Sequence, residues 1–178
     1  TENCSNPDIR TDQERISSVI REKSRVLSHQ IRFKVMGDCS TLPKETISLI
    51  SELEELTKDF RGLKLTIAFG YGGRAELINA MNSWIDLNPG RRIDVESFEQ
   101  NLMVPDIGDV DLLIRTGGDH RISNFLLWQI AYAELIFTNT PWPDFSTEEF
   151  ERIIVDFRKI DRRFGVLENQ KSLKESVE

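Results

Sequence analysis

Hydrophobic and polar residues follow two different spacings in turn along this chain. Apolar and polar residues alternate in 31–38 (IRFKVMGD) and 63–69 (LKLTIAF), which predicts two half-buried strands. The run that begins at Val110 (VDLLI) is almost entirely apolar, as expected of a strand covered on both faces. A fourth strand is predicted at 134–138 (ELIFT).

Between these strands, apolar residues recur at every third or fourth position, which predicts helices. The segment 88–97 (NPGRRIDVES) is rich in turn residues and is interpreted as a surface connection. The apolar segment 125–133 (FLLWQIAYA) is interpreted as a buried helix. The other expected helices run from Thr11 to Leu27, from Pro43 through Leu53, from the end of GYGGR through Trp84, and from Ser146 through Ile160.

Strands that alternate with helices predict an α/β fold, with a mainly parallel sheet and helices on both of its faces. Four strands make a small sheet for this class, which is consistent with one or more N-terminal strands lying outside this sequence. Ligands of such sheets bind beyond the carboxyl ends of the strands. Two glycine-rich turns, 70–74 (GYGGR) and 115–123 (RTGGDHRIS), follow predicted strands, so we expect the ligand site to form around them.

Composition narrows the class of protein. The 178 residues, 39% hydrophobic and 30% charged, predict one globular domain at 1–165 and a polar tail at 166–178. The formal net charge of −7 argues against a nucleic-acid partner, which requires a basic face. Cys4 and Cys39 provide neither a disulfide framework nor metal-ligand spacing, and no apolar run is long enough to cross a membrane. A cytoplasmic location is therefore expected.

The loop RTGGDHRIS concentrates cations in an otherwise acidic chain. Arg115 and Arg121 carry guanidinium groups whose geometry matches phosphate oxygens, and Ser123 is a candidate N-cap before an apolar helix. A helix start also presents free N–H groups to an anion, so the loop predicts a diphosphate clamp. The alternative is that the arginines form salt bridges with nearby aspartates, and the pattern alone favours neither interpretation. The candidate partners are Asp109, Asp111 and Asp119.

Glu134 stands between two apolar runs, where a carboxylate is costly unless it is paired or bound to a metal. Mg²⁺ takes one or two carboxylates and completes its shell with phosphates and water, so Glu134 is a candidate magnesium ligand. The alternative is a buried ion pair with an arginine such as Arg115. His120 is consistent with a phosphate donor, a metal ligand or a surface residue. Arg74 of GYGGR is more consistent with a surface residue beside a sharp turn.

A long motif connects these residues to a known family. Residues 109–145 (DVDLLIRTGGDHRISNFLLWQIAYAELIFTNTPWPDF) resemble the C-terminal signature of the cis-prenyltransferases, the undecaprenyl diphosphate synthase family. Shorter pieces agree in the same order along the chain, so that the resemblance covers about residues 1 to 165. These pieces are TEN (1–3), VMGD (35–38) with LP (42–43), YGGR (71–74) and RRFG (162–165).

The resemblance implies a reaction and a set of site residues. Members of the family extend an allylic diphosphate, typically farnesyl diphosphate, by repeated addition of isopentenyl diphosphate with cis double bonds, which gives an undecaprenyl-type product. Mg²⁺ is the implied cofactor, with Glu134 as a ligand and His120 near it. Asn3 is the implied catalytic residue, which orients the substrates and assists proton loss. The implied substrate-binding residues are Thr1, Glu2, Gly73, Arg74, Arg115, Arg121, Ile122, Ser123, Arg163 and Gly165.

The resemblance also implies partners. The segment from Arg163 to Gly165 is similar to a motif that reaches into the neighbouring subunit, which implies a homodimer. A long polyprenyl product implies peripheral association with a membrane.

The chain departs from the family pattern at three places. The family begins with a strand and a loop of the type MDGNGRW, whose aspartate is essential, and this sequence contains no such segment; alone, the chain is expected to bind isopentenyl diphosphate at best. Cys4 and Asn6 stand where Trp and Arg usually follow TEN, and Gly70 replaces the usual Asn before YGGR. The alternatives to an enzyme are a non-catalytic subunit that supports a catalytic partner, and a phosphate-binding module without a Walker or dinucleotide fingerprint.

Overall fold

A computed structural model describes residues 22–162 of the chain. The chain divides into two compact units, Thr1–Pro105 (the first unit) and Asp106–Glu178 (the second unit). Most of the helix predicted from Thr11 and the polar tail 166–178 lie outside the described residues. The predicted site residues outside them are Thr1, Glu2, Asn3, Arg163 and Gly165.

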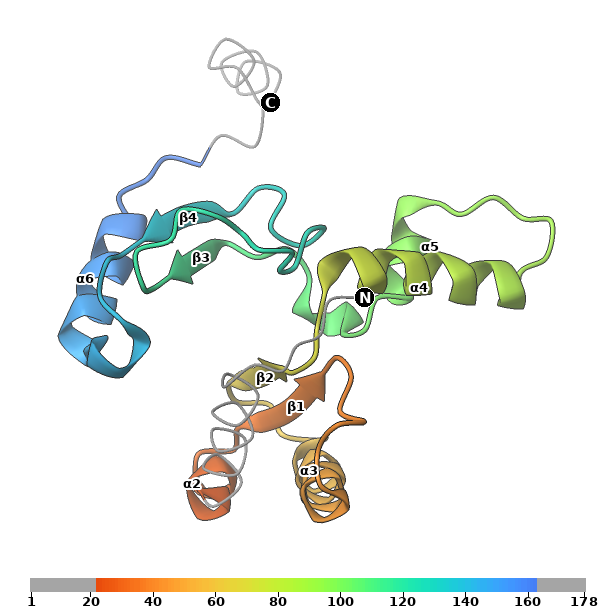
Figure 1. The fold of residues 1–178 in the computed structure, drawn as a ribbon, viewed down its shortest axis with the longest axis horizontal. Coiled ribbons are helices and arrows are strands. Elements are labelled where there is room, and N and C mark those ends of the chain that lie inside the picture. The colour runs from red at the N-terminus through yellow and green to blue at the C-terminus, as the bar shows by residue number, and fades with distance from the viewer. Residues whose placement is uncertain (1–21, 163–178) are drawn as a thin grey trace, which may run out of the picture. The chain divides into compact units, whose positions relative to one another are not determined.

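The first unit contains a parallel pair of strands, as the alternating patterns predict. Phe33 of β1 lies opposite Leu65 of β2, and Val35 lies opposite Ile67. The predicted strands 31–38 and 63–69 are therefore confirmed, although both are shorter than their patterns. The elements of this unit, in chain order, are α2 (Lys23–Ser28), β1 (Arg32–Met36), α3 (Lys44–Thr57), β2 (Lys64–Ala68), α4 (Gly73–Leu87) and α5 (Val95–Gln100) (Figure 1).

The core of the first unit lies against one face of this strand pair. Because side chains alternate along a strand, Phe33 and Val35 share a face with their partners on β2, and α2 and α3 pack against that face (Figure 1). Each fully buried side chain of this size stabilises the fold by about 1.5–3 kcal/mol. The fully buried cluster consists of Val26, Phe33, Leu42, Ile50, Leu53 and Phe69.

Side chains of helix α3 also accept hydrogen bonds from the backbone N–H groups on the edge of β1 that faces away from β2. The N–H of Phe33 donates to Thr57 Oγ1 at 3.1 Å, and the N–H of Val35 donates to Glu54 Oε1 at 2.8 Å. The N–H of Arg32 instead donates toward β2, to the carbonyl of Leu63 at 2.9 Å. These side chains therefore bond to N–H groups that would otherwise be open to pairing with another strand.

The turns that follow β1 and β2 touch each other. The N–H of Phe69 donates to the carbonyl of Met36 at 2.8 Å, and that of Asp38 donates to the carbonyl of Gly70 at 3.3 Å. Gly70 has φ 56°, and a Cβ at this position would lie 2.5 Å from the carbonyl oxygen of Asp38. In this chain the glycine that replaces the family's usual Asn is thus required by both the backbone conformation and the close approach.

The connection predicted at 88–97 is partly wrong, because helix α5 begins inside it at Val95. Asp94 caps this helix: its Oδ1 accepts the N–H of Ser97 at 2.8 Å. Phe98 and Leu102, four residues apart, are buried on one side. The turn residues at the start of the segment mark the end of α4, and the same segment also contains the cap of the next helix.

The second unit contains another parallel strand pair and a helix. Leu112 of β3 lies opposite Glu134 of β4, and Arg115 lies opposite Phe137, which confirms both predicted strands. Its elements are β3 (Leu112–Arg115), β4 (Glu134–Phe137), a 3-10 turn at Trp142–Asp144 and α6 (Thr147–Phe157), and a further 3-10 turn at Pro105–Ile107 spans the boundary between the units (Figure 1). The α/β class and the parallel pairing are as predicted. In the described residues the four strands form two separate two-stranded sheets.

The predicted helix at 125–133 is wrong. Ser123, Asn124 and Leu126 have φ values of 52°, 64° and 44°, which lie in the left-handed region and cannot belong to a right-handed helix. A series of turns takes its place, closed by bonds such as that from the N–H of Ile130 to the carbonyl of Leu126 at 3.1 Å. Leu126 and Ile130 are buried, so the segment is apolar because it is buried and not because it is helical. Ser123 is accordingly not an N-cap.

Arg162, the first arginine of the RRFG motif, follows α6 and contacts residues that lie just before β3 and β4. Its Nη1 pairs with Asp111 Oδ1, and its Nη2 donates to the carbonyl of Tyr132 at 3.5 Å. Its guanidinium carbon also lies 5.8 Å from the centre of the Phe157 ring. Among residues 22–162, no helix is long and apolar enough to cross a membrane.

Candidate functional site

The loop RTGGDHRIS begins where β3 ends, as predicted. Gly117 and Gly118 adopt φ values of 90° and 82°, which residues other than glycine rarely adopt. The N–H of Gly117 donates to the carbonyl of Thr140 at 3.0 Å, and that of Gly118 donates to the carbonyl of Thr138 at 2.9 Å. The glycine pair is therefore held by the backbone that follows β4, which leaves the side chains of the loop to form the site.

The structure brings Arg115, Arg121 and Ser123 together around one carboxylate, that of Asp119. Nη1 of Arg115 donates to Ser123 Oγ at 2.7 Å and to the carbonyl of Arg121 at 2.5 Å. Nη2 of Arg115 donates to Asp119 Oδ2 at 2.9 Å, and Nη2 of Arg121 reaches the same oxygen at 2.5 Å. Of the three aspartates considered as partners of these arginines, Asp119 is the one that pairs with them.

The ion pairs with Asp119 and a diphosphate clamp use the same N–H groups. The Arg121 side chain is 65% exposed and the Arg115 side chain 24%, so the Arg121–Asp119 pair faces solvent while the Arg115–Asp119 pair is partly buried. Exposed ion pairs contribute only about 0–1 kcal/mol each, whereas two-pronged arginine contacts with phosphate are stronger. A diphosphate can therefore displace the carboxylate, or bind to the N–H groups that it leaves open. Ile122, between Arg121 and Ser123, is half-buried.

Glu134 and His120 lie at opposite ends of β4. Glu134 is the first residue of this strand, while His120, from the loop after β3, packs its ring at a tilt beside Phe137, the last residue, with 5.0 Å between ring centres. Three residues along a strand span roughly 10 Å, and side chains 134 and 137 point to opposite faces. Within residues 22–162, no group of three or more His, Cys, Asp or Glu side chains could hold a metal ion.

Glu134 does not form the predicted alternative ion pair with Arg115, which bonds to Asp119 instead. Glu134 lies half-buried, with its N–H bonded to the carbonyl of Asp111 at 3.0 Å. A carboxylate is a donor that Mg²⁺ prefers, whereas an imidazole is not, so Glu134 fits a magnesium ion better than His120 does. The predicted metal roles of both residues stay predictions.

Gly73 and Arg74, the other predicted substrate-binding residues, lie in the first unit. Gly73 is buried at the first position of α4 and Arg74 is exposed at the second. Sequence reasoning missed the buried carboxylate two residues further on. Glu76 is 1% exposed; its Oε2 accepts the Tyr71 hydroxyl at 2.5 Å and its Oε1 accepts the N–H of Met103 at 3.2 Å. These contacts tie the YGGR turn to the segment after α5.

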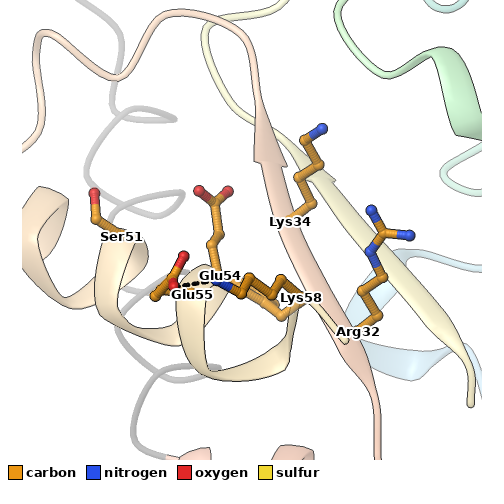
Figure 2. Close-up of a pocket in the computed structure, with 7 residues that line it drawn as sticks. Arg32, Lys34, Ser51, Glu54, Glu55 and Lys58 are labelled. Atoms are coloured by element: carbon orange, nitrogen blue, oxygen red, sulfur yellow. Dashed lines mark hydrogen bonds and ion pairs between the residues drawn. The ribbon is translucent and has the colours of Figure 1, made fainter. Parts of the chain in front are cut away.

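A groove of about 270 Å³ lies between β1 and α3, and no predicted site residue lines it. In Figure 2, Arg32 and Lys34 extend from β1 away from α3, and Lys58 pairs with Glu55. The nearby Cys39 thiol is partly buried, and burial, with Glu54 and Asp38 close by, raises its pKa, which disfavours the reactive thiolate. The groove is lined by Arg32, Phe33, Lys34, Ser51, Glu54, Glu55 and Lys58.

The fold and the loop define an α/β protein with an arginine cluster at the carboxyl end of a parallel strand. The family model described as putative undecaprenyl diphosphate synthase matches residues 1–165. The chain therefore belongs to the undecaprenyl diphosphate synthase family.

Relatives of known sequence agree with this assignment. The chain is 41% identical over 157 residues to an isoprenyl transferase of Thermotoga maritima, an alignment that covers 86% of this chain and 67% of the relative. It is 43% identical over 143 residues to the ditrans,polycis-undecaprenyl-diphosphate synthase ((2E,6E)-farnesyl-diphosphate specific) of Escherichia coli K12, covering 77% of this chain and 56% of that enzyme. The chain thus spans between about half and two thirds of the length of these relatives.

Solved structures agree as well. A probable undecaprenyl diphosphate synthase from Campylobacter jejuni superimposes with a TM-score of 0.80 at 35% identity, covering 91% of this chain and 77% of that chain. Lavandulyl diphosphate synthase from Lavandula x intermedia, solved in complex with dimethylallyl diphosphate, gives a TM-score of 0.76 at 34% identity, covering 89% and 70%.

Proposed function

We propose that this chain carries the isopentenyl-diphosphate-binding site of a cis-prenyltransferase that elongates an allylic diphosphate, with farnesyl diphosphate as the expected primer. The observation that carries the proposal is the cluster of Arg115, Arg121 and Ser123 at the end of β3. Relatives named isoprenyl transferase and undecaprenyl-diphosphate synthase support the reaction class. All three side chains of the cluster are retained, which counts against a non-catalytic subunit.

In this proposal the loop holds the diphosphate of isopentenyl diphosphate and thereby orients its double bond. Arg115 and Arg121 offer forked donors to the phosphate oxygens, Ser123 offers a hydroxyl, and Ile122 adds an apolar contact. In each condensation, a carbon–carbon bond forms between the isopentenyl double bond and the allylic carbon. The carbon–oxygen bond to the allylic diphosphate breaks, and one proton leaves the isopentenyl unit. Asn3 is proposed to assist that proton loss, and Thr1, Glu2, Gly73 and Arg74 to bind substrate.

We further propose that Glu134 contributes a carboxylate to Mg²⁺, which when bound offsets the negative charge of the diphosphate. His120 is kept as a proposed contact of the metal or the phosphate, although its ring lies beside Phe137 at the other end of β4. The segment from Arg163 to Gly165 is proposed to complete the site of the neighbouring subunit in a homodimer. The protein is proposed to be cytoplasmic. Its lipid product is proposed to bring it to a membrane surface.

The experiment that tests the proposal is equilibrium binding of isopentenyl diphosphate to the purified protein and to Arg121→Ala. Loss of a charge-assisted contact weakens binding by about 1.5–3 kcal/mol, which is at least ~10-fold in Kd. Arg91→Ala, in the turn after α4, removes an equally exposed arginine outside the loop and serves as the control. Isopentenyl monophosphate is the matched ligand, and it is expected to bind more weakly. Equal affinity of Arg121→Ala and Arg91→Ala would contradict the assignment.

A further inference from the structure

Glu149, in the first turn of α6, reaches back to the two threonines that follow β4. Its Oε1 accepts the hydroxyl of Thr138 at 2.7 Å and that of Thr140 at 3.2 Å. The N–H of Glu149 is itself fixed by the cap, because it donates to Ser146 Oγ at 3.2 Å. The sequence pairs Ser146 with Glu149 as a capping box, and the structure shows Ser146 acting as the cap while the carboxylate binds elsewhere.

The same two threonines hold the glycine pair of the RTGGDHRIS loop. Their carbonyls accept the N–H groups of Gly117 and Gly118, at 3.0 Å from Thr140 and 2.9 Å from Thr138. The N–H of Thr138 donates in turn to the carbonyl of Arg115 at 2.9 Å, and the N–H of Thr140 donates to Thr138 Oγ1 at 3.2 Å. Glu149 is therefore joined to the loop by two short hydrogen-bonded routes.

These bonds matter because packing does little to fix this part of the loop. A Cβ added at Gly117 would meet no atom within 4 Å, and one added at Gly118 would meet only Asn139. Glycine also loses more conformational freedom on ordering than any other residue. The backbone of the loop at Gly117 and Gly118 is thus held mainly by the hydrogen bonds from their N–H groups to the carbonyls of Thr140 and Thr138.

We propose that Glu149 is a positioning residue for the diphosphate-binding loop and acts through Thr138 and Thr140. The carboxylate holds both hydroxyls at once, which fixes the turn between the two threonines and keeps both carbonyls directed at the glycine amides. Glu149 itself contacts no substrate in this role. The part of the inference that concerns affinity for isopentenyl diphosphate rests on the proposed function, whereas the part that concerns the loop backbone does not.

The variants that test this are Glu149→Ala, which removes the acceptor, and Glu149→Gln, whose amide oxygen can still accept both hydroxyls. Glu148→Ala is the matched control, because it removes a carboxylate from the same turn of α6 without touching the threonines. The first measurement is hydrogen exchange of the Gly117 and Gly118 amides by NMR. We expect exchange in Glu149→Ala to be about fivefold faster than in Glu148→Ala, and Glu149→Gln to restore protection.

The second measurement is the Kd of isopentenyl diphosphate by equilibrium binding. We expect about a fivefold increase in Kd for Glu149→Ala, with Glu148→Ala and Glu149→Gln near the parent value. Combining Glu149→Ala with Thr138→Val should add little to either change alone, because both break the same route. Equal glycine exchange in Glu149→Ala and Glu148→Ala, or a Gln variant as impaired as the Ala variant, overturns the inference. Absence of isopentenyl diphosphate binding by the parent counts against the proposed function, and the exchange measurement still tests the loop.

Discussion

Replacement of Gly70 by Ala tests how much the close contact between the turns after β1 and β2 contributes to the stability of the first unit. Gly70 has φ 56°, so an alanine would adopt left-handed backbone at a cost of about 1–2 kcal/mol. Its Cβ would also lie 2.5 Å from the backbone oxygen of Asp38, which has to move. Forced contacts of this kind cost roughly 1–3 kcal/mol, so the total loss of stability is about 2–5 kcal/mol.

Gly90 provides a control that separates the two contributions. It has φ 77°, also left-handed, but a Cβ there would meet nothing within 4 Å. Gly90→Ala should therefore cost only the backbone part, about 1–2 kcal/mol. The difference between the two variants measures the contact with Asp38.

The assay is thermal and urea unfolding followed by circular dichroism. A loss of 1 kcal/mol lowers Tm by roughly 2–4 °C in a chain of this size, so the two variants should differ by several degrees. Gly70→Asn introduces the residue usual in the family. Compared with Gly70→Ala, it should have less backbone strain but the same close contact between its Cβ and the carbonyl oxygen of Asp38. Equal destabilisation by Gly70→Ala and Gly90→Ala would refute the close approach as a structural constraint.

Two further perturbations test single contacts. Glu76→Ala leaves the N–H of Met103 without its buried acceptor and should lower the free energy of unfolding by about 2–4 kcal/mol, whereas Glu76→Gln keeps an acceptor oxygen and should lose less, as measured by urea unfolding. The pKa of Asp94 is lowered by hydrogen bonds from the backbone and hydroxyl of Ser97, so its contribution as a cap is full at neutral pH and is lost as pH falls through that depressed value. Asp94→Asn should cap α5 without this acid dependence, and identical acid unfolding profiles of Asp94→Asn and the parent protein would contradict the sign.

The strands were predictable because their signal is local. Alternation in 31–38 and 63–69 reports directly on the face that packs against α2 and α3. The apolar run at 110–114 predicted a strand correctly, although the residues of β3 are half-buried and not covered on both faces. The carboxyl-end position of the RTGGDHRIS loop followed from the same pattern. The cluster of Arg115, Arg121 and Ser123 could therefore be anticipated from residue type and place in the chain.

The errors came from features that depend on distant contacts. An apolar run such as 125–133 has the same signature whether it is a buried helix or a buried series of turns, and the hydroxyl of Ser123 is bonded to Arg115. Glu149 matches a capping box in sequence, yet its carboxylate binds side chains nine and eleven residues earlier. Nothing in the spacing of Glu76 indicates that its carboxylate is buried against Met103, which is 27 residues away.

The carboxylates of Asp119 and Glu149 thus contact different parts of the same site, Asp119 the arginine side chains and Glu149 the threonines that hold the loop backbone. In the proposed site Asp119 would compete with phosphate for the N–H groups of Arg115 and Arg121; the Arg121 pair is exposed and contributes at most about 1 kcal/mol, and the Arg115 pair is partly buried. Glu149 would not compete, because its carboxylate accepts the hydroxyls of Thr138 and Thr140, and its proposed role is to stabilise the backbone that presents those arginines. Weakening the Asp119 pairs should therefore raise affinity for an anion and broaden its selectivity, whereas weakening the Glu149 contacts should lower affinity without changing which anion is preferred. Titration of Asp119→Asn and Glu149→Ala with diphosphate and with sulfate distinguishes these effects, and a parallel change in both variants would refute the division of roles.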